Sequence, residues 1–143
     1  MNIVSLLIEK KLKIATAESC TGGLIAKLIT DVSGSSECFE MGLVTYSNSA
    51  KEKLLGVSHQ TLSEHGAVSE QTAAQMCEGL FTKYGSDIAV SVTGIAGPTG
   101  GTPEKPVGLV YVGVCGKFGP CVKRLELSGT RDEIREKIGR AHV

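Results

Sequence analysis

The alternation of apolar and polar positions along the 143 residues predicts helices interleaved with strands, and then a late hairpin. Apolar residues at helical spacing, closed by a capping residue or a glycine, predict helices within 1–13, 24–31, 48–55, 58–65, 70–84 and 131–143. Short apolar runs that end in small polar residues predict strands within 13–16, 39–47, 87–93, 107–115 and 121–127. Asn48 or Ser49, Ser58, Ser69 and Thr130 are the predicted helix caps.

This order of elements predicts an α/β protein. Helices that alternate with strands favour parallel pairing, while two strands joined by residues 116–120 favour an antiparallel hairpin. We therefore expect a single three-layer α/β/α domain over residues 1–143, with a mixed sheet. No internal repeat or low-complexity linker divides the sequence.

Composition narrows the class of protein. Lys and Arg total 15, as do Asp and Glu, so the chain has no basic excess to displace counterions from a nucleic acid. Three Phe, three Tyr and no Trp leave few rings for stacking on bases. No apolar run reaches the ~18 residues of a membrane span, and residues 1–13 lack the charge order of a signal peptide. We expect a cytoplasmic protein that binds neither nucleic acid nor membrane.

The five cysteines form no CxxC pair and have no metal-ligand spacing, which argues against a disulfide scaffold and against a metal site. Four of them are predicted to be small buried apolar residues: Cys38, Cys77, Cys115 and Cys121. Cys20 precedes a predicted helix, where a thiol can have a lowered pKa. It has no neighbouring histidine, so it is a poor candidate nucleophile.

Candidate chemistry gathers where three predicted strands end: in Ser19 to Gly23, in Val44 to Lys51, and in Ser91 to Pro98. Ligands of open α/β sheets bind outside the carboxyl ends of parallel strands, so these segments are expected to converge on one crevice. The helix that starts after Gly23 favours an anion at its N-terminus. Residues 94–101 resemble a loop whose free backbone N–H groups bind phosphate or carboxylate.

Ser19 needs a base to act as a nucleophile, and the best candidate is Lys51, provided that burial lowers its pKa. Tyr46 would relay the proton or hold the pair in place. Each of these residues also has a simpler possible role: Lys51 as a solvated helix lysine and Tyr46 as a packing residue. Glu18 could bind a cation or orient Lys51, or it could be only a polar residue at the end of a strand. Arg131 opens a helix, where the dipole disfavours a cation, which hints at an anionic partner. The three histidines lie in other segments and GxSxG is absent, so a Ser-His-Asp triad is poorly supported.

Taken together, the motifs resemble the CinA C-terminal domain family, which includes stand-alone bacterial nicotinamide mononucleotide deamidases. The resemblance covers nearly the whole chain and is carried by five ordered segments: Thr16 to Gly23, Gly42 to Lys51, Gly66 to Ser69, Ser91 to Pro98, and Lys105 to Gly108. Family members often carry a further N-terminal nucleotide-processing domain, which we do not expect within these 143 residues.

The resemblance implies hydrolysis of nicotinamide mononucleotide to nicotinic acid mononucleotide and ammonia, without a cofactor or metal. It implies Ser19, Lys51 and Tyr46 as catalytic residues. The implied substrate-binding residues are Cys20, Thr21, Gly22, Gly23, Thr93, Gly94, Ala96, Gly97 and Arg131. We also expect a homo-oligomer.

Two other readings remain open. One is a non-catalytic nucleotide-binding or regulatory module of the same fold. The other is a short-chain dehydrogenase, which is disfavoured because four residues, not three, separate Tyr46 from Lys51 and because no glycine fingerprint follows the first strand.

Overall fold

The computed structural model describes residues 2–142, whose strands form a five-stranded sheet in the order β2-β1-β3-β4-β5. The strands are β1 (Ile14–Glu18), β2 (Phe39–Val44), β3 (Ile88–Gly94), β4 (Leu109–Gly116) and β5 (Gly119–Glu126). β1 pairs in parallel with both β2 and β3, whereas the pairs β3–β4 and β4–β5 are antiparallel. The predicted mixed sheet with a late hairpin is confirmed.

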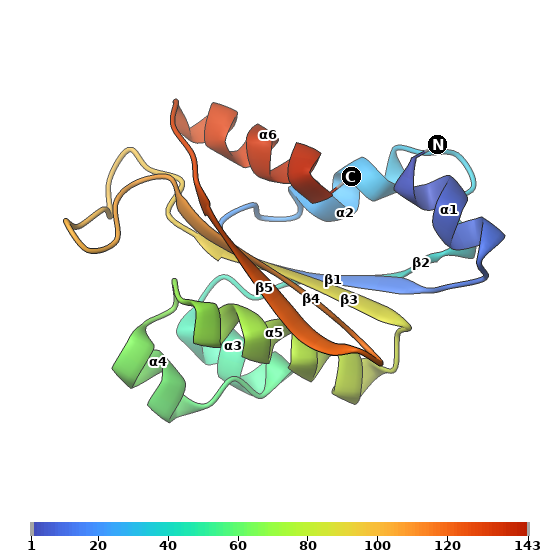
Figure 1. Ribbon diagram of the computed structural model, residues 1–143, viewed down its shortest axis with the longest axis horizontal. Coiled ribbons are helices and arrows are strands. Elements are labelled where there is room, and N and C mark those ends of the chain that lie inside the picture. Colours follow the sequence, from blue (N-terminus) through green and yellow to red (C-terminus); the bar gives the residue numbers. More distant parts are fainter. Residues whose placement is uncertain (1, 143) are drawn as a thin grey trace.

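Helices cover both faces of this sheet (Figure 1). One layer contains α1 (Ile3–Glu9), α2 (Leu24–Thr30) and α6 (Arg131–His142), and the other contains α3 (Asn48–Leu55), α4 (His59–His65) and α5 (Glu70–Tyr84). A short 3-10 helix, Ser35–Glu37, precedes β2. The predicted three-layer architecture is thus confirmed; Met1 and Val143, which two of the predicted helices included, lie outside the described residues.

Two apolar cores result, one on each face of the sheet. Ile25, Ile29, Ile134 and Ile138 belong to the core under α2 and α6, while Met76 and Leu80 of α5 belong to the other. All five residues of β1 are buried, because a central strand with helices on both sides has no solvent face. Within residues 2–142 no helix has the length and apolar character needed to cross a bilayer.

One boundary that differs from expectation matters for the site. β2 ends at Val44, three residues early, and Ser47 caps α3 by accepting the N–H of Ala50 at 3.0 Å. Ser47, rather than Asn48 or Ser49, is therefore the cap. The hairpin turn is also tighter than expected, since Gly116 already pairs with Gly119.

The cysteines are free in the described chain, and all but one are buried. Cys121 is exposed, which corrects the expectation of burial. It lies on β5, whose position at the edge of the sheet leaves most of its side chains in solvent.

Candidate active site

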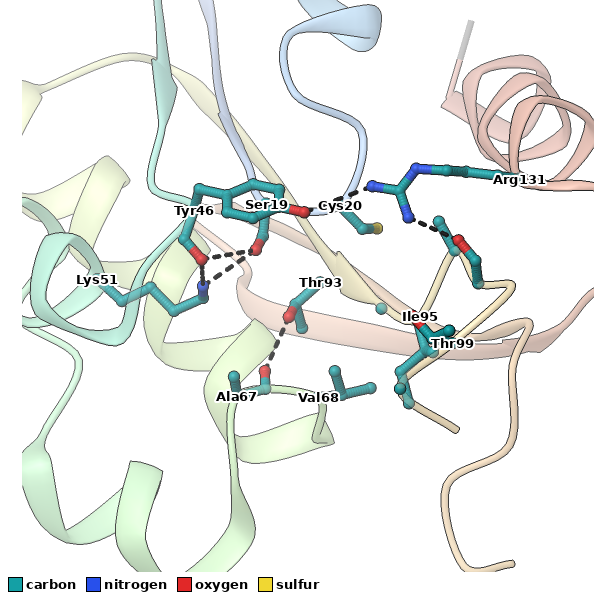
Figure 2. Close-up of a pocket in the computed structure, with 14 residues that line it drawn as sticks. Ser19, Cys20, Tyr46, Lys51, Ala67, Val68, Thr93, Ile95, Thr99 and Arg131 are labelled. Carbon is teal, nitrogen blue, oxygen red and sulfur yellow. Dashed lines mark hydrogen bonds between the residues drawn. The ribbon is translucent and has the colours of Figure 1, made fainter. Parts of the chain in front are cut away.

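The carboxyl ends of β1, β2 and β3 meet at one edge of the sheet because these strands run in the same direction. A pocket of about 340 Å³ opens there (Figure 2). Its lining comes from the three expected segments, from the continuation of the third to Gly100, from the turn before α5 and from the start of α6: Ser19, Cys20, Tyr46, Lys51, Ala67, Val68, Thr93, Gly94, Ile95, Ala96, Gly97, Thr99, Gly100 and Arg131.

Ser19 and Lys51 form the polar centre of this pocket. Lys51 Nζ lies 3.0 Å from Ser19 Oγ, although 32 positions separate the two residues in sequence. Ser19 immediately follows β1, and Lys51 lies in the first turn and a half of α3. Because β1 and β2 are adjacent and parallel, the turn after β1 and the helix after β2 lie side by side.

Lys51 is almost completely buried, with 1% of its surface exposed. Its amine is within hydrogen-bond distance of the carbonyl oxygens of Thr45 (2.9 Å) and Tyr46 (3.1 Å) as well as of Ser19 Oγ. Burial disfavours the ammonium form and lowers the pKa of Lys51 from its ordinary 10.5 to about 8. At this pKa about a tenth of the amine is neutral at pH 7, far more than at the ordinary value.

The hydrogen-bond frame around Nζ fits both protonation states of the amine. The ammonium donates to Ser19 Oγ and to the carbonyls of Thr45 and Tyr46, while the Ser19 hydroxyl donates to the Tyr46 carbonyl at 3.5 Å. Once neutral, the amine keeps two N–H groups for the two carbonyls, and its lone pair can accept the Ser19 proton. The pair can thus hold the proton on either Ser19 or Lys51 without moving.

Tyr46 contributes differently from what the sequence suggested. Its backbone carbonyl contacts the pair, but its phenol extends away across the pocket mouth, where the hydroxyl accepts from Arg131 Nη2 at 3.5 Å (Figure 2). The side chain is 61% exposed. A proton relay through the phenol does not fit this geometry; the residue holds Lys51 through its main chain.

Glu18 is the residue whose role the sequence did not reveal. It is 1% exposed, and its carboxylate accepts from Thr21 Oγ1 (2.6 Å) and from the N–H groups of Gly23 (3.2 Å), Ile25 (2.8 Å) and Ala26 (3.0 Å). The N-terminus of α2, which we expected to attract a ligand anion, is therefore already occupied by an anion of the chain itself. The signal was an acidic residue six positions before a predicted helix start, with a glycine-containing turn between them.

Three of the expected substrate-binding residues lie outside the pocket lining. Thr21 is fully buried with its hydroxyl on Glu18, the Gly22 N–H donates to the Ser19 carbonyl (3.1 Å), and the Gly23 N–H donates to Glu18. Cys20 does line the pocket. Burial raises the pKa of its thiol to about 11, so the thiolate that a nucleophilic cysteine requires is disfavoured.

The loop after β3 forms the opposite wall. Gly94, Ala96 and Gly97 all line the pocket, as expected. Thr93 also lines it, but its hydroxyl donates to the Ala67 carbonyl at 2.8 Å and so fastens β3 to the turn before α5 (Figure 2). Ala67 and Val68 complete this wall; they fall in the third segment of the family resemblance, which carried no predicted site residue.

Arg131 lies at the pocket mouth. Its Nη1 donates to the Gly97 carbonyl at 2.6 Å, and its Nη2 reaches the Tyr46 hydroxyl. The lining thus contains two basic residues, Lys51 and Arg131, and no carboxylate. The described chain holds no cluster of His, Cys, Asp and Glu suited to a metal ion, and no histidine lines this pocket.

The fold and the pocket define a three-layer α/β protein with a buried serine–lysine pair at the carboxyl edge of its parallel strands. The comparison with family models names the family: the CinA C-terminal domain matches residues 1–142. The chain therefore belongs to the CinA C-terminal domain family, as the sequence motifs had indicated.

Relatives and solved structures agree with this assignment. A putative competence-damage inducible protein of Caldanaerobacter subterraneus is 57% identical over 94% of this chain, which spans about a third of that relative (33%). The crystal structure of the competence/damage inducible protein CihA from Agrobacterium tumefaciens matches 98% of this chain and 86% of its own, with 44% identity and a TM-score of 0.95. The corresponding ComA structure from Klebsiella pneumoniae has 34% identity and a TM-score of 0.94, and the match covers 98% of this chain and 87% of its own.

Proposed function

We propose that this domain is an amidohydrolase that deamidates nicotinamide mononucleotide, with Ser19 as nucleophile and Lys51 as general base. The observation that carries the proposal is the buried Lys51 amine, whose pKa is lowered to about 8 and which lies 3.0 Å from Ser19 Oγ. A serine becomes a nucleophile when a neighbouring base accepts its proton, and a base works best with a pKa near the working pH.

The proposed reaction has two stages. Ser19 Oγ attacks the carboxamide carbon while its proton passes to neutral Lys51; the C–N bond then breaks, and the proton on Lys51 leaves with the ammonia. Water next attacks the acyl-enzyme and gives its proton to Lys51, and the Ser19–acyl bond breaks with return of that proton to Oγ. The products are ammonia and the carboxylate form of the nucleotide.

The negative oxygen formed in each stage needs N–H donors. The Gly22 and Gly23 amides are already used within the turn, and Thr21 is buried outside the pocket lining, so the amide of Cys20, which lines the pocket, is the donor that we assign to this oxygen. Loss of one such donor typically costs ~3–4 kcal/mol of transition-state stabilisation.

The charge of the pocket supports an anionic substrate. Glu18 occupies the N-terminus of α2, so we assign the phosphate to Arg131 and to the loop of residues 94–101. A planar guanidinium binds phosphate through paired hydrogen bonds. Arg131 now bonds the Gly97 carbonyl and the Tyr46 hydroxyl, so substrate binding would exchange these partners for phosphate oxygens.

The test is ammonia release from nicotinamide mononucleotide by the purified protein. Ser19→Ala and Lys51→Met are expected to lose at least about 1000-fold in kcat, because each removes one half of the nucleophile–base pair. Ser49→Ala and Lys53→Met are the matched controls, since both residues are exposed on α3. Full turnover by Ser19→Ala would overturn the proposal, and nucleotide binding without any turnover would favour the non-catalytic module instead.

A further inference from the structure

The turn that carries the candidate nucleophile is held from outside by a residue of α6. Arg135 Nη2 donates to the Thr21 carbonyl at 2.9 Å, across 114 positions of sequence. That carbonyl also accepts the N–H of Leu24 in the first turn of α2, so the guanidinium binds where the turn becomes a helix. Ser19 lies two residues before Thr21.

Arg135 packs directly over the backbone of this turn. A Cβ added at Gly22 would lie 3.3 Å from Arg135 Nη2, in a residue whose φ of +61° already favours glycine. The Arg135 Nε is buried and has no hydrogen-bond partner among residues 2–142. Within the described chain, Arg135 forms no ion pair with the acidic residues of its own helix, and the nearest one on its C-terminal side, Glu136, pairs with Arg140. Within residues 2–142, the hydrogen bond to the Thr21 carbonyl is therefore the polar contact that this guanidinium makes.

Arg135 and Arg131 both connect α6 to segments around the pocket. Four residues apart, they lie on the same side of the helix, one turn from each other. Arg131 contacts the segments after β2 and β3, through Tyr46 and Gly97, while Arg135 contacts the segment after β1. The helix itself is anchored by Ile134 and Ile138, both fully buried. One helix therefore touches all three strand ends that build the pocket.

We propose that Arg135 is a positioning residue: its guanidinium, by holding the Thr21 carbonyl, fixes the turn so that Ser19 Oγ stays within hydrogen-bond distance of Lys51 Nζ. Arg135 does not line the pocket, so it acts through the turn and not on the substrate. The inference rests on the proposed Ser19–Lys51 hydrolysis, and it extends the site beyond the residues that contact the pocket.

The test compares Arg135→Met, which keeps the aliphatic length and removes the donors, with Arg135→Lys, which restores one donor. Arg140→Met is the control, because Arg140 is an exposed arginine of the same helix. Displacement of a nucleophile by a fraction of an ångström to 1 Å costs about 10- to 100-fold in rate. We expect Arg135→Met to lose that much in kcat for ammonia release with less than about a threefold change in KM, Arg135→Lys to recover part of it, and Arg140→Met to match wild type.

A second measurement reads Ser19 without the proposed substrate. An alkyl fluorophosphonate reacts with an activated serine: the Oγ–P bond forms, the P–F bond breaks, fluoride leaves, and the hydroxyl proton passes to Lys51. We expect Arg135→Met to be labelled at Ser19 about 10-fold or more slowly than wild type, with far-UV circular dichroism and melting temperature close to wild type.

The possible outcomes test the role of Arg135 separately from the proposed substrate. Three results would overturn the positioning role. The first is unchanged kcat and labelling in Arg135→Met, and the second is a rise in KM alone. The third is a loss of activity that Arg135→Lys does not restore and that follows a lowered melting temperature. Labelling of wild type without ammonia release would refute the nucleotide substrate and still leave the labelling rates to judge Arg135. Absence of both labelling and ammonia release in wild type would overturn both proposals, and if labelling alone is absent, the kcat of Arg135→Met decides its role.

Discussion

The lowered pKa of Lys51 is also a statement about stability, and it can be measured without any substrate. Folding moves this pKa from its ordinary 10.5 to about 8, a difference that corresponds to about 3 kcal/mol of unfavourable free energy for keeping a buried ammonium. Between pH 8 and 10.5 the unfolded chain binds the proton and the folded chain does not. Lys51 therefore makes the folded state more stable as pH rises through this window, and its cost is complete below about pH 8.

The perturbation is Lys51→Met, which keeps the length of the side chain and removes the titrating group. Loss of the amine leaves the carbonyls of Thr45 and Tyr46 without this donor, a cost that does not depend on pH. The advantage of wild type over the variant should therefore grow with pH, by about 3 kcal/mol in total and by no more than about 1.4 kcal/mol per pH unit.

The assay is urea denaturation of both proteins at half-unit steps from pH 7 to 10.5, analysed as the difference in free energy of unfolding at each pH. Other groups titrate alike in the two proteins, so their effects cancel in the difference. Lys53→Met, which removes an exposed lysine of the same helix, should run parallel to wild type. Parallel curves for Lys51→Met as well would show that the amine titrates normally, and the general-base reasoning would fail.

Three further predictions concern Lys51, Glu18 and Gly79. The kcat/KM of wild type for ammonia release should rise with pH and level off above about pH 8, because only the neutral Lys51 amine accepts a proton; a profile that is flat from pH 6 to 9 would contradict this. Glu18→Gln places an amide NH₂ among the donors that now surround a carboxylate, so thermal denaturation should show a loss of about 2–4 kcal/mol, whereas a change below 0.5 kcal/mol would refute the internal cap. Gly79→Ala puts a Cβ 1.7 Å from the Leu55 carbonyl oxygen, where α5 crosses the end of α3. We expect the free energy of unfolding in urea to fall by about 3 kcal/mol or more, and activity to fall because α3 carries Lys51. A wild-type denaturation midpoint would show that the two helices can separate freely.

Local sequence determined much of the secondary structure. The helix 70–84 follows from a capping serine, apolar residues at helical spacing and a closing glycine, and its bounds agree with those of α5. Boundaries were less certain where several residues could serve the same purpose. Ser47, Asn48 and Ser49 are all good caps, and the choice of Ser47 depended on where β2 leaves the sheet.

The candidate pair was predictable for a physical reason. Polar residues that follow parallel strands must gather at one edge of a sheet, and the segments with Ser19, Lys51 and Thr93 each follow such a strand. The direction of each side chain was not predictable. The Tyr46 phenol points to Arg131, while the backbone carbonyls of Thr45 and Tyr46 contact the Lys51 amine.

By itself, then, the sequence determined the order of elements, the family and the segments that meet at the pocket, because periodicity, caps and motifs are local properties of the chain. Only the tertiary structure decided which role each residue of these segments has at the site. The burial that lowers the pKa of Lys51, the occupation of the α2 N-terminus by Glu18 and the reach of Arg135 to the Thr21 carbonyl all depend on atoms from distant positions. Desolvation and hydrogen-bond geometry are fixed when the layers pack, and no pattern along a single segment encodes them.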